Sequence, residues 1–196
     1  IDAGRKPQGE LLKQWELRVG EYVVVVGRLV KTKSVETVVG AWRKLSREDR
    51  GKLKLVIVGD ESFSREYAAG IKKAAGRDDS IVFTGWQEGK ALHALIGHAR
   101  LFVSASLSEG LPIALLEAMS YGLPAIVSDI PAHRELITQS EARFHVRDNK
   151  ELARLLKRAL QDPGWYKKLG KHNQNVVRRD YQWDAVVEKT VEVYRR

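Results

Sequence analysis

One pattern recurs along the chain and limits the folds that it can adopt: a short β-branched run, a turn, and then a helix with an apolar stripe. The runs are apolar on both faces, which is typical of strands in a parallel sheet that helices cover on two sides. The pattern therefore predicts a Rossmann-like α/β domain, a doubly wound parallel sheet with right-handed crossovers. We expect strands at Tyr22–Val26, Leu53–Val58, Ile81–Thr84, Leu101–Ser104, Ala125–Ser128 and the less apolar Arg143–Val146.

Apolar residues at helical spacing fill the segments between these strands. The predicted helices are a stripe through Val35, Val38, Val39 and Trp42, then Arg65–Ala75, Ala91–His98, Ile113–Tyr121, a stripe from Leu152 to Leu160, Pro163–Arg179 and Trp183–Arg196. The last helix carries Trp183, Val186, Val187, Val191 and Tyr194 on one face. We expect that face to pack against another surface.

The composition bounds the class of protein. A chain of 196 residues is long enough for one well-formed core, and without cysteine it has neither disulfides nor thiolate chemistry. Its net charge of +9 favours anionic partners, but the basic residues are scattered and show no nucleic-acid-binding motif. No apolar run is long enough to span a membrane. The start, Ile1 to Pro7, shows neither a targeting signal nor an initiator Met, which we interpret as a fragment of a longer, cytoplasmic protein.

Several common sites are missing from the sequence. No strand is followed by the Gly-x-Gly-x-x-Gly of dinucleotide-binding domains, and no Gly-x-Ser-x-Gly nucleophile elbow occurs. The segment Gly85–Lys90 has three residues between its glycines where a phosphate-binding P-loop has four. The histidines lack the spacing of metal ligands, His93 and His98 being five residues apart. We therefore expect no metal and no cofactor.

Glu117 is the most unusual residue of the segment from Ser104 to Met119. The predicted helix after Pro112 is apolar on every side except at Glu117, and burying a carboxylate is costly unless it meets hydrogen-bond donors. Two interpretations remain: an ordinary helix glutamate that reaches solvent or an arginine, or a carboxylate that accepts hydrogen bonds from a ligand such as a ribose diol.

Glu109 lies in the loop before this helix, together with Gly110 and Leu111. Backbone N–H groups near a helix N-terminus favour an anion, so this loop is a candidate phosphate site beside a carboxylate. The alternative is that Glu109 simply caps the helix. A second loop, Gly27–Ser34, follows the first strand and carries Arg28 and Lys33, two cations suited to a pyrophosphate. Both loops follow strands, so they should meet at one edge of the sheet, where doubly wound domains bind ligands.

The spacing of these residues resembles a known signature. Ser-x-x-Glu109-Gly-Leu-Pro-x-x-x-x-Glu117-Ala-Met, preceded by Gly27-Arg28-Leu29-x-x-x-Lys33, is similar to the motifs of the retaining group 1 glycosyltransferases. Further similar segments are Val82–Gly85, Tyr121–Asp129, Tyr181-x-Trp183 and the start at Ile1-Asp2. The resemblance spans the chain and departs at Ser34, where the family usually has glycine, and at Glu61-Ser62, where a glycine often follows Gly59.

The resemblance implies a two-domain GT-B enzyme, of which residues 1–196 would be the C-terminal, donor-binding domain without the N-terminal acceptor domain. It implies that Arg28 and Lys33 hold the diphosphate of a nucleotide sugar and that Glu117 holds the ribose. Glu109, as the catalytic carboxylate, would contact the transferred sugar with the Gly110 and Leu111 amides, and the loop of Thr84, Gly85 and Trp86 would flank the base.

The function so implied is transfer of a hexosyl group to an acceptor hydroxyl, with the isolated domain inactive alone. The acceptor would be a saccharide or a lipid-linked glycan, and a lipid-linked acceptor would bring peripheral contact with a membrane. The alternatives are a non-catalytic nucleotide-sugar-binding module and a GT-B epimerase or synthase. A basic nucleic-acid binder is the third class, and the missing motifs disfavour it.

Overall fold

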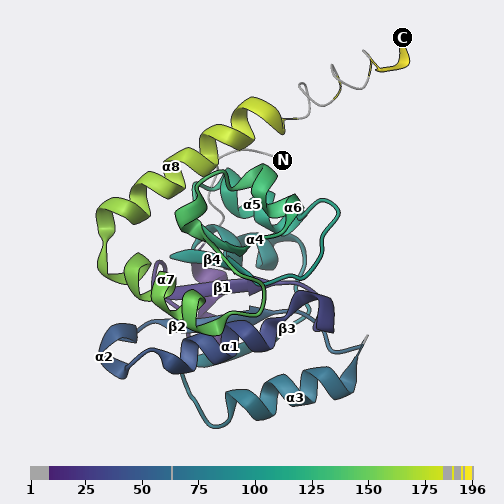
Figure 1. Ribbon diagram of the computed structural model, residues 1–196. Coiled ribbons are helices and arrows are strands. Elements are labelled where there is room, and N and C mark those ends of the chain that lie inside the picture. Colours follow the sequence, from purple (N-terminus) through teal and green to yellow (C-terminus); the bar gives the residue numbers. More distant parts are fainter. Residues whose placement is uncertain (1–8, 63, 183–186, 188–190, 192, 196) are drawn as a thin grey trace.

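A parallel sheet forms the centre of the molecule (Figure 1). The computed structural model describes the chain except for residues 1–8, 63, 183–186, 188–190, 192 and 196. The strands are β1 (Tyr22–Val26), β2 (Lys54–Val58), β3 (Ile81–Gly85), β4 (Leu101–Ser104), β5 (Ala125–Ser128) and β6 (Arg143–Phe144). They lie in the order β3-β2-β1-β4-β5-β6, all parallel, so the direction of winding reverses between β1 and β4.

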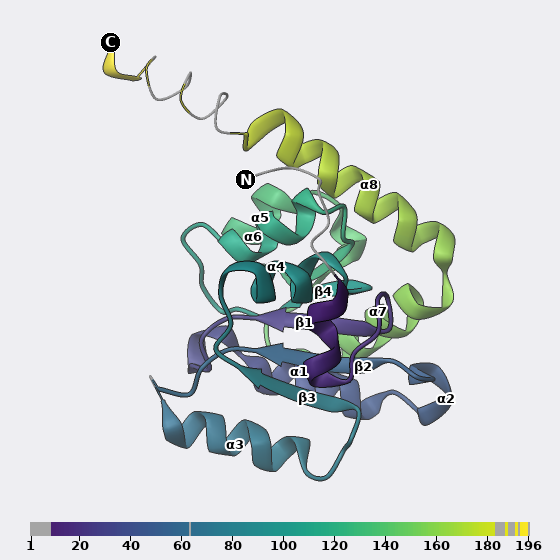
Figure 2. The same ribbon diagram turned by 180° about the vertical axis from the view of Figure 1, so that it is seen from behind.

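The helices are η1 (Gly9–Trp15), η2 (Lys31–Lys33), α1 (Val35–Lys44), α2 (Arg47–Arg50), α3 (Arg65–Ala75), α4 (Gly89–Gly97), α5 (Ile113–Ser120), α6 (Pro131–Leu136), η3 (Ser140–Ala142), α7 (Asn149–Gln161) and α8 (Pro163–Asp180). On one face of the sheet, α1 packs against α3 and α7. On the other, α4 packs against η1 and α5, as Figure 2 shows from behind. The predicted doubly wound α/β fold is therefore confirmed.

The core consists of strand residues sealed between the two helical layers. Val23 and Val24 of β1 are fully buried, as are the larger Tyr22, Trp42 and Phe102. Two of the buried aromatic side chains have partners for their polar atoms: the Tyr22 hydroxyl donates to the Leu95 carbonyl at 2.8 Å, and Trp42 Nε1 donates to the Ser80 hydroxyl at 2.9 Å. Such pairing removes most of the cost of burying a hydroxyl in an apolar core.

Strand β6 is shorter than the predicted Arg143–Val146. It pairs with β5 only through Arg143 and Phe144. The next backbone N–H, that of His145, donates instead to the Glu151 carboxylate of α7 at 2.7 Å. Because that N–H is taken by a side chain, the ladder of hydrogen bonds ends there.

Helix α8 packs against α5, α7 and β5, so it connects the two helical layers. The approach to the turn after α5 is close: a Cβ on Gly170 would lie 2.3 Å from the Gly122 carbonyl oxygen. Asn173, buried on the same helix, donates to the Leu123 carbonyl at 2.9 Å. Glycine at position 170 is therefore a requirement of helix packing.

The apolar face predicted for the last helix is only partly described. Trp183 and Val186 lie outside the described residues. Of the others, Val187 is 53% exposed, Val191 39% and Tyr194 87%, so the predicted packing is not seen for them. Within the described part of the chain, no helix is long and apolar enough to cross a membrane.

Candidate functional site

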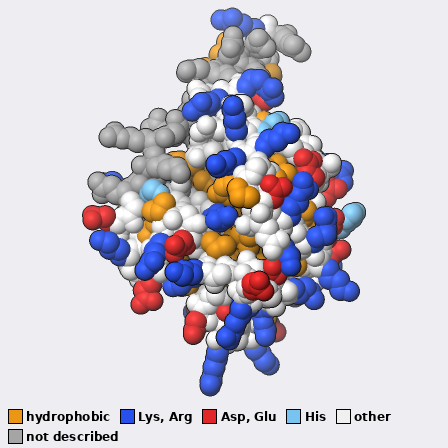
Figure 3. All heavy atoms as spheres, turned by 90° about the vertical axis from the view of Figure 1, so that its left-hand side faces the viewer, with side chains coloured by type: hydrophobic (Ala, Val, Ile, Leu, Met, Phe, Trp, Pro, Cys, Tyr) orange, Lys and Arg blue, Asp and Glu red, His pale blue; other side chains and the backbone are white. Residues whose placement is uncertain are grey.

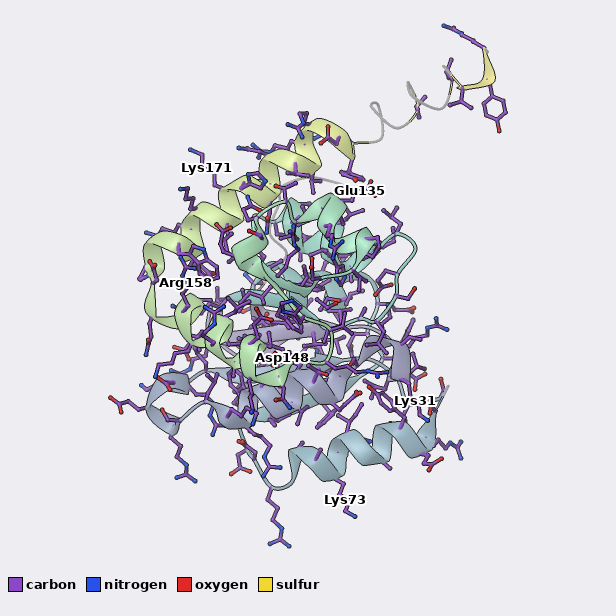
Figure 4. All side chains as sticks on the ribbon, in the orientation of Figure 1. Lys31, Lys73, Glu135, Asp148, Arg158 and Lys171 are labelled. Carbon is purple, nitrogen blue, oxygen red and sulfur yellow. The ribbon has the colours of Figure 1, made fainter. Side chains whose placement is uncertain are left out.

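A pocket of about 540 Å³ opens at the carboxyl ends of β1, β2 and β4, where the strand order reverses. Lys31 of η2, which follows β1, marks this end of the sheet in Figure 4. Doubly wound sheets bind ligands at this place. The lining includes six predicted site residues, namely Arg28, Lys33, Trp86, Glu109, Leu111 and Glu117. It does not include Thr84, Gly85 or Gly110.

The loop after β1 is seated on the end of β2. The Gly27 N–H donates to the Val58 carbonyl at 3.0 Å, and a Cβ on Gly59 would lie 2.0 Å from the Gly27 carbonyl oxygen. The same loop is joined to the loop after β4, because the Leu107 N–H donates to the Thr32 carbonyl at 2.8 Å. The two loops that carry the predicted cations and Glu109 are thus held together through the backbone.

Lys33 and Glu109 form an ion pair across the switch point. The Lys33 Nζ lies 2.5 Å from Glu109 Oε1, which also accepts from the Ser106 hydroxyl at 2.6 Å. Burial raises the pKa of Glu109, but the hydrogen bonds from Lys33 and Ser106 outweigh it and hold the pKa below its usual value. Glu109 is therefore ionised at neutral pH, and the Lys33 ammonium keeps further N–H donors for an anion.

Ser34 adopts the left-handed conformation that usually belongs to glycine. It precedes α1 with φ 47° and ψ 42°, and its side chain is fully buried. Its hydroxyl lies 2.9 Å from the Thr37 hydroxyl. This conformation explains why the similar family motif usually has glycine here, since a residue with a Cβ is strained in the left-handed region.

Glu117 projects from α5 into the pocket. Burial raises the pKa of its carboxyl, and the charge of nearby His93 opposes the shift only in part. Among the described residues, no side chain is hydrogen-bonded to this carboxylate, so it fits the second of the two sequence-based interpretations, a carboxylate open to a ligand. Because it lines the pocket, a ligand hydroxyl could reach it and donate to it.

His93 also lines the pocket, although the sequence analysis considered it only as a metal ligand and found its spacing from His98 unsuitable. Its Nδ1 lies 3.2 Å from the Tyr121 hydroxyl at the end of α5. The sequence places His93 on the helix before β4, but it does not show that this side chain faces α5, because that depends on how the two helices pack. No group of three or more potential metal ligands occurs in the part of the chain that the structure describes.

The loop after β3 and the loop before α5 form the rim of the pocket. Trp86 is 59% exposed and Leu111 54%, whereas the Thr84 hydroxyl turns back to the Gly85 carbonyl at 3.2 Å. Helix α5 begins at Ile113, the predicted start, with Pro112 as its N-cap, so Gly110 and Leu111 lie in the loop just before its first turn, as expected.

A second cleft, of about 610 Å³, lies at the opposite end of the sheet and is lined by Arg43, Arg47, Arg50 and Arg77 with Asp78 and Asp79. Two of the arginines already have partners within the chain: Arg43 donates to the Ala74 carbonyl at 2.5 Å, and Arg50 pairs with Asp78 at 2.8 Å. Figure 3 shows this side of the molecule, where basic and acidic side chains are interspersed. The pocket at the carboxyl ends of the strands is therefore the better candidate site.

Comparison with known proteins gives the family. The model of the family "Glycosyl transferases group 1" matches residues 10–176. An uncharacterized glycosyltransferase of Methanocaldococcus jannaschii is 30% identical over 175 residues, which are 88% of this chain and 44% of that protein. The chain thus spans less than half the length of that relative.

Two solved structures have the same fold. The C-terminal domain of a glycosyl transferase group 1 family protein from Francisella tularensis superposes with a TM-score of 0.75 at 20% identity, over 92% of this chain and 96% of that one. An Anabaena protein in complex with UDP-glucose gives 0.84 at 16%, over 95% and 51%. With the family model covering most of its length, this chain belongs to the group 1 glycosyltransferases, which have the GT-B fold.

Proposed function

We propose that this chain is the donor-binding domain of a retaining hexosyltransferase. The full enzyme would move a hexosyl group from a nucleotide diphosphate sugar to the hydroxyl of a saccharide or lipid-linked glycan, in the cytoplasm and in peripheral contact with the membrane where the acceptor is lipid-linked. The observation that carries the proposal is the pocket at the switch point, a volume of about 540 Å³ whose lining includes the cations Arg28 and Lys33 and two carboxylates of different character, Glu109 and Glu117. The complex of the Anabaena protein with UDP-glucose supports the donor class.

Each part of the donor has a partner of suitable chemistry. Arg28 and Lys33 would bind the diphosphate, and Glu117 would accept hydrogen bonds from the ribose hydroxyls. Glu109 would accept from the transferred sugar, while the amides of Gly110 and Leu111 would donate to it and to the distal phosphate. The exposed Trp86, with Thr84 and Gly85 behind it, would flank the base.

The proposed reaction exchanges one C–O bond for another on the same face of the sugar. The bond from the anomeric carbon to the diphosphate oxygen breaks, and the bond to the acceptor oxygen forms. The acceptor proton passes to the departing phosphate. Arg28 and Lys33 would offset the charge that develops on that phosphate, so the domain's contribution is electrostatic and positional.

Binding of a nucleoside diphosphate should not depend on a divalent metal. Guanidinium and ammonium groups bind phosphate directly, so UDP or GDP should titrate the chain with a measurable Kd in EDTA. Calorimetry would check this, with Arg28→Ala as the control that weakens the diphosphate more than the nucleoside. Saturation only after Mg²⁺ or Mn²⁺ is added would contradict the prediction.

Nucleotide affinity should fall as the pH is lowered, beginning above the usual pKa of a glutamate. Burial raises the pKa of Glu117, and protonation removes the charge of the carboxylate and turns one of its oxygens into a donor, so the bonds that it accepts from two ribose hydroxyls are weakened. Titration of UDP from pH 7 down to pH 4.5 would measure this. In Glu117→Gln that component of the pH dependence should vanish, and an identical profile in the variant would refute the assignment.

The 196-residue chain should not transfer sugar by itself. A second domain is needed to place the acceptor, and positioning accounts for a large share of the lowered barrier. Turnover of donor and acceptor by the chain alone should fall far below the ~1 per second of ordinary enzymes. Adding the missing domain should restore it. No product from a full-length protein that binds donor tightly would favour a non-catalytic binding module.

A further inference from the structure

His133 is a buried histidine that the proposed reaction does not use. It lies on α6, just after β5, with no exposed surface, and it does not line the pocket. Its Nδ1 is 2.9 Å from the Ser128 carbonyl oxygen, which can only accept a hydrogen bond. The proton of the imidazole therefore resides on Nδ1. Burial lowers the pKa of His133, so the ring is neutral at pH 7.

A series of hydrogen bonds leads from this ring to Glu109. The Ser128 hydroxyl, 3.2 Å from Nδ1, donates to the Ser106 carbonyl at 2.5 Å. The Ser106 hydroxyl donates in turn to Glu109 Oε1 at 2.6 Å. The series runs from α6 through the end of β5 to the loop after β4, and it passes through Ser106 itself, whose carbonyl accepts and whose hydroxyl donates. These bonds order the groups that they join: Ser128 holds the backbone of Ser106, and the Ser106 side chain holds Glu109.

The other ring nitrogen shows that His133 is not there for packing. Its Nε2 is buried with no hydrogen-bond partner among the described residues. A buried acceptor without a partner destabilises the folded protein, and a leucine of similar size would avoid that cost. What histidine provides and leucine lacks is the Nδ1–H, which donates to the Ser128 carbonyl.

We propose that His133 is a positioning residue, which fixes the Glu109 carboxylate through Ser128 and Ser106. Lys33 holds the same carboxylate oxygen from the opposite loop, so the carboxylate is held from both sides of the switch point. The effect on sugar binding rests on the proposed function, because it requires that Glu109 contact the transferred sugar. The effect on Glu109 itself does not.

The test compares two replacements of His133. His133→Leu removes the Nδ1–H, whereas His133→Asn keeps an N–H at nearly the same position. Ile137→Val is the control for altered packing. It leaves a small cavity at the buried C-terminal end of α6, and Ile137 takes no part in the hydrogen-bond series. NMR titration of the Glu109 carboxyl should show its pKa rise toward the usual value in His133→Leu, and stay unchanged in His133→Asn and Ile137→Val. Should His133→Leu fail to fold, Ser128→Ala breaks the same series and should raise the pKa equally.

A second measurement separates this inference from the proposed function. The preference for UDP-glucose over UDP should fall about tenfold in His133→Leu, the equivalent of one charge-assisted hydrogen bond. It should not fall further when Glu109→Gln is already present. An unchanged Glu109 titration in a folded His133→Leu overturns the inference. A shifted titration in a protein that never prefers UDP-glucose supports the inference and refutes the sugar-binding role of Glu109.

Discussion

Replacing Glu117 with glutamine should weaken the binding of bare UDP or GDP by about 10- to 100-fold. The carboxylate lines the pocket, and no described side chain is hydrogen-bonded to it. A charge-assisted hydrogen bond to the ribose is worth roughly 1.5–3 kcal/mol, which sets that range. Because glutamine also removes a carboxylate whose burial raises its pKa, the domain should lose no stability at pH 7. Calorimetric titration, with thermal unfolding of both proteins as the check on folding, would measure the loss.

Glu109→Gln is the matched variant, with the same change of chemistry at the other carboxylate. It should leave the Kd of the bare nucleotide nearly unchanged, because its proposed partner is the sugar. In the full-length enzyme it should lower turnover, and unlike Glu117→Gln it should cost stability, since it breaks the pair with Lys33. If wild type and folded Glu117→Gln bound the nucleotide equally well, Glu117 would not be the residue that binds the ribose.

Gly59→Ala, directly after β2, should be a strongly disruptive single-methyl change. The added Cβ would lie 2.0 Å from the Gly27 carbonyl oxygen, and neither backbone can yield without moving the loop that carries Arg28 and Lys33. We expect a loss of about 1–3 kcal/mol in the free energy of unfolding, as for other overpacked sites. In a domain of this size each kcal/mol lowers Tm by roughly 2–4 °C. The affinity for UDP should fall more than that for uridine, because the displaced groups, Arg28 and Lys33, are the proposed partners of the diphosphate.

Gly70→Ala gives the control. Gly70 lies inside α3, and a Cβ there would have no neighbour within 4 Å. Alanine should stabilise this helix by about 0.5–1 kcal/mol and leave UDP binding unchanged. If Gly59→Ala behaved like Gly70→Ala, the loop after β1 would not be seated on β2 as described.

The regular part of the fold could be predicted from local pattern. The bounds expected for β1, β4, β5 and α3 agree with the structure, because strongly apolar runs and helical stripes depend on few neighbours. The helices η1 and α6 were not predicted, since each is short, and η1 depends on its packing against α4. Strand β6 ends early for a reason of the same kind, a side chain from α7 that takes its backbone N–H.

The site divides in a similar way. Sequence spacing brought together Arg28, Lys33, Glu109 and Glu117, since loops after parallel strands converge on one edge. It could not predict that Lys33 pairs with Glu109, or that Ser128 and His133 stand behind that carboxylate. Such contacts depend on side-chain directions after the layers have packed, which no local pattern encodes.

The pairing of β1 with β4 also governs when the pocket can exist. Lys33 and Glu109 are 76 residues apart, and the intervening chain forms β2 and β3 on the other side of β1. Closing so long a loop costs entropy before any contact repays it, so this step belongs to the slow, non-local phase of folding. As the chain emerges from the ribosome, β1, β2 and β3 can pair while half of the pocket is still unmade. A nucleotide can therefore stabilise the finished sheet by mass action, but it cannot serve as a template for its first half.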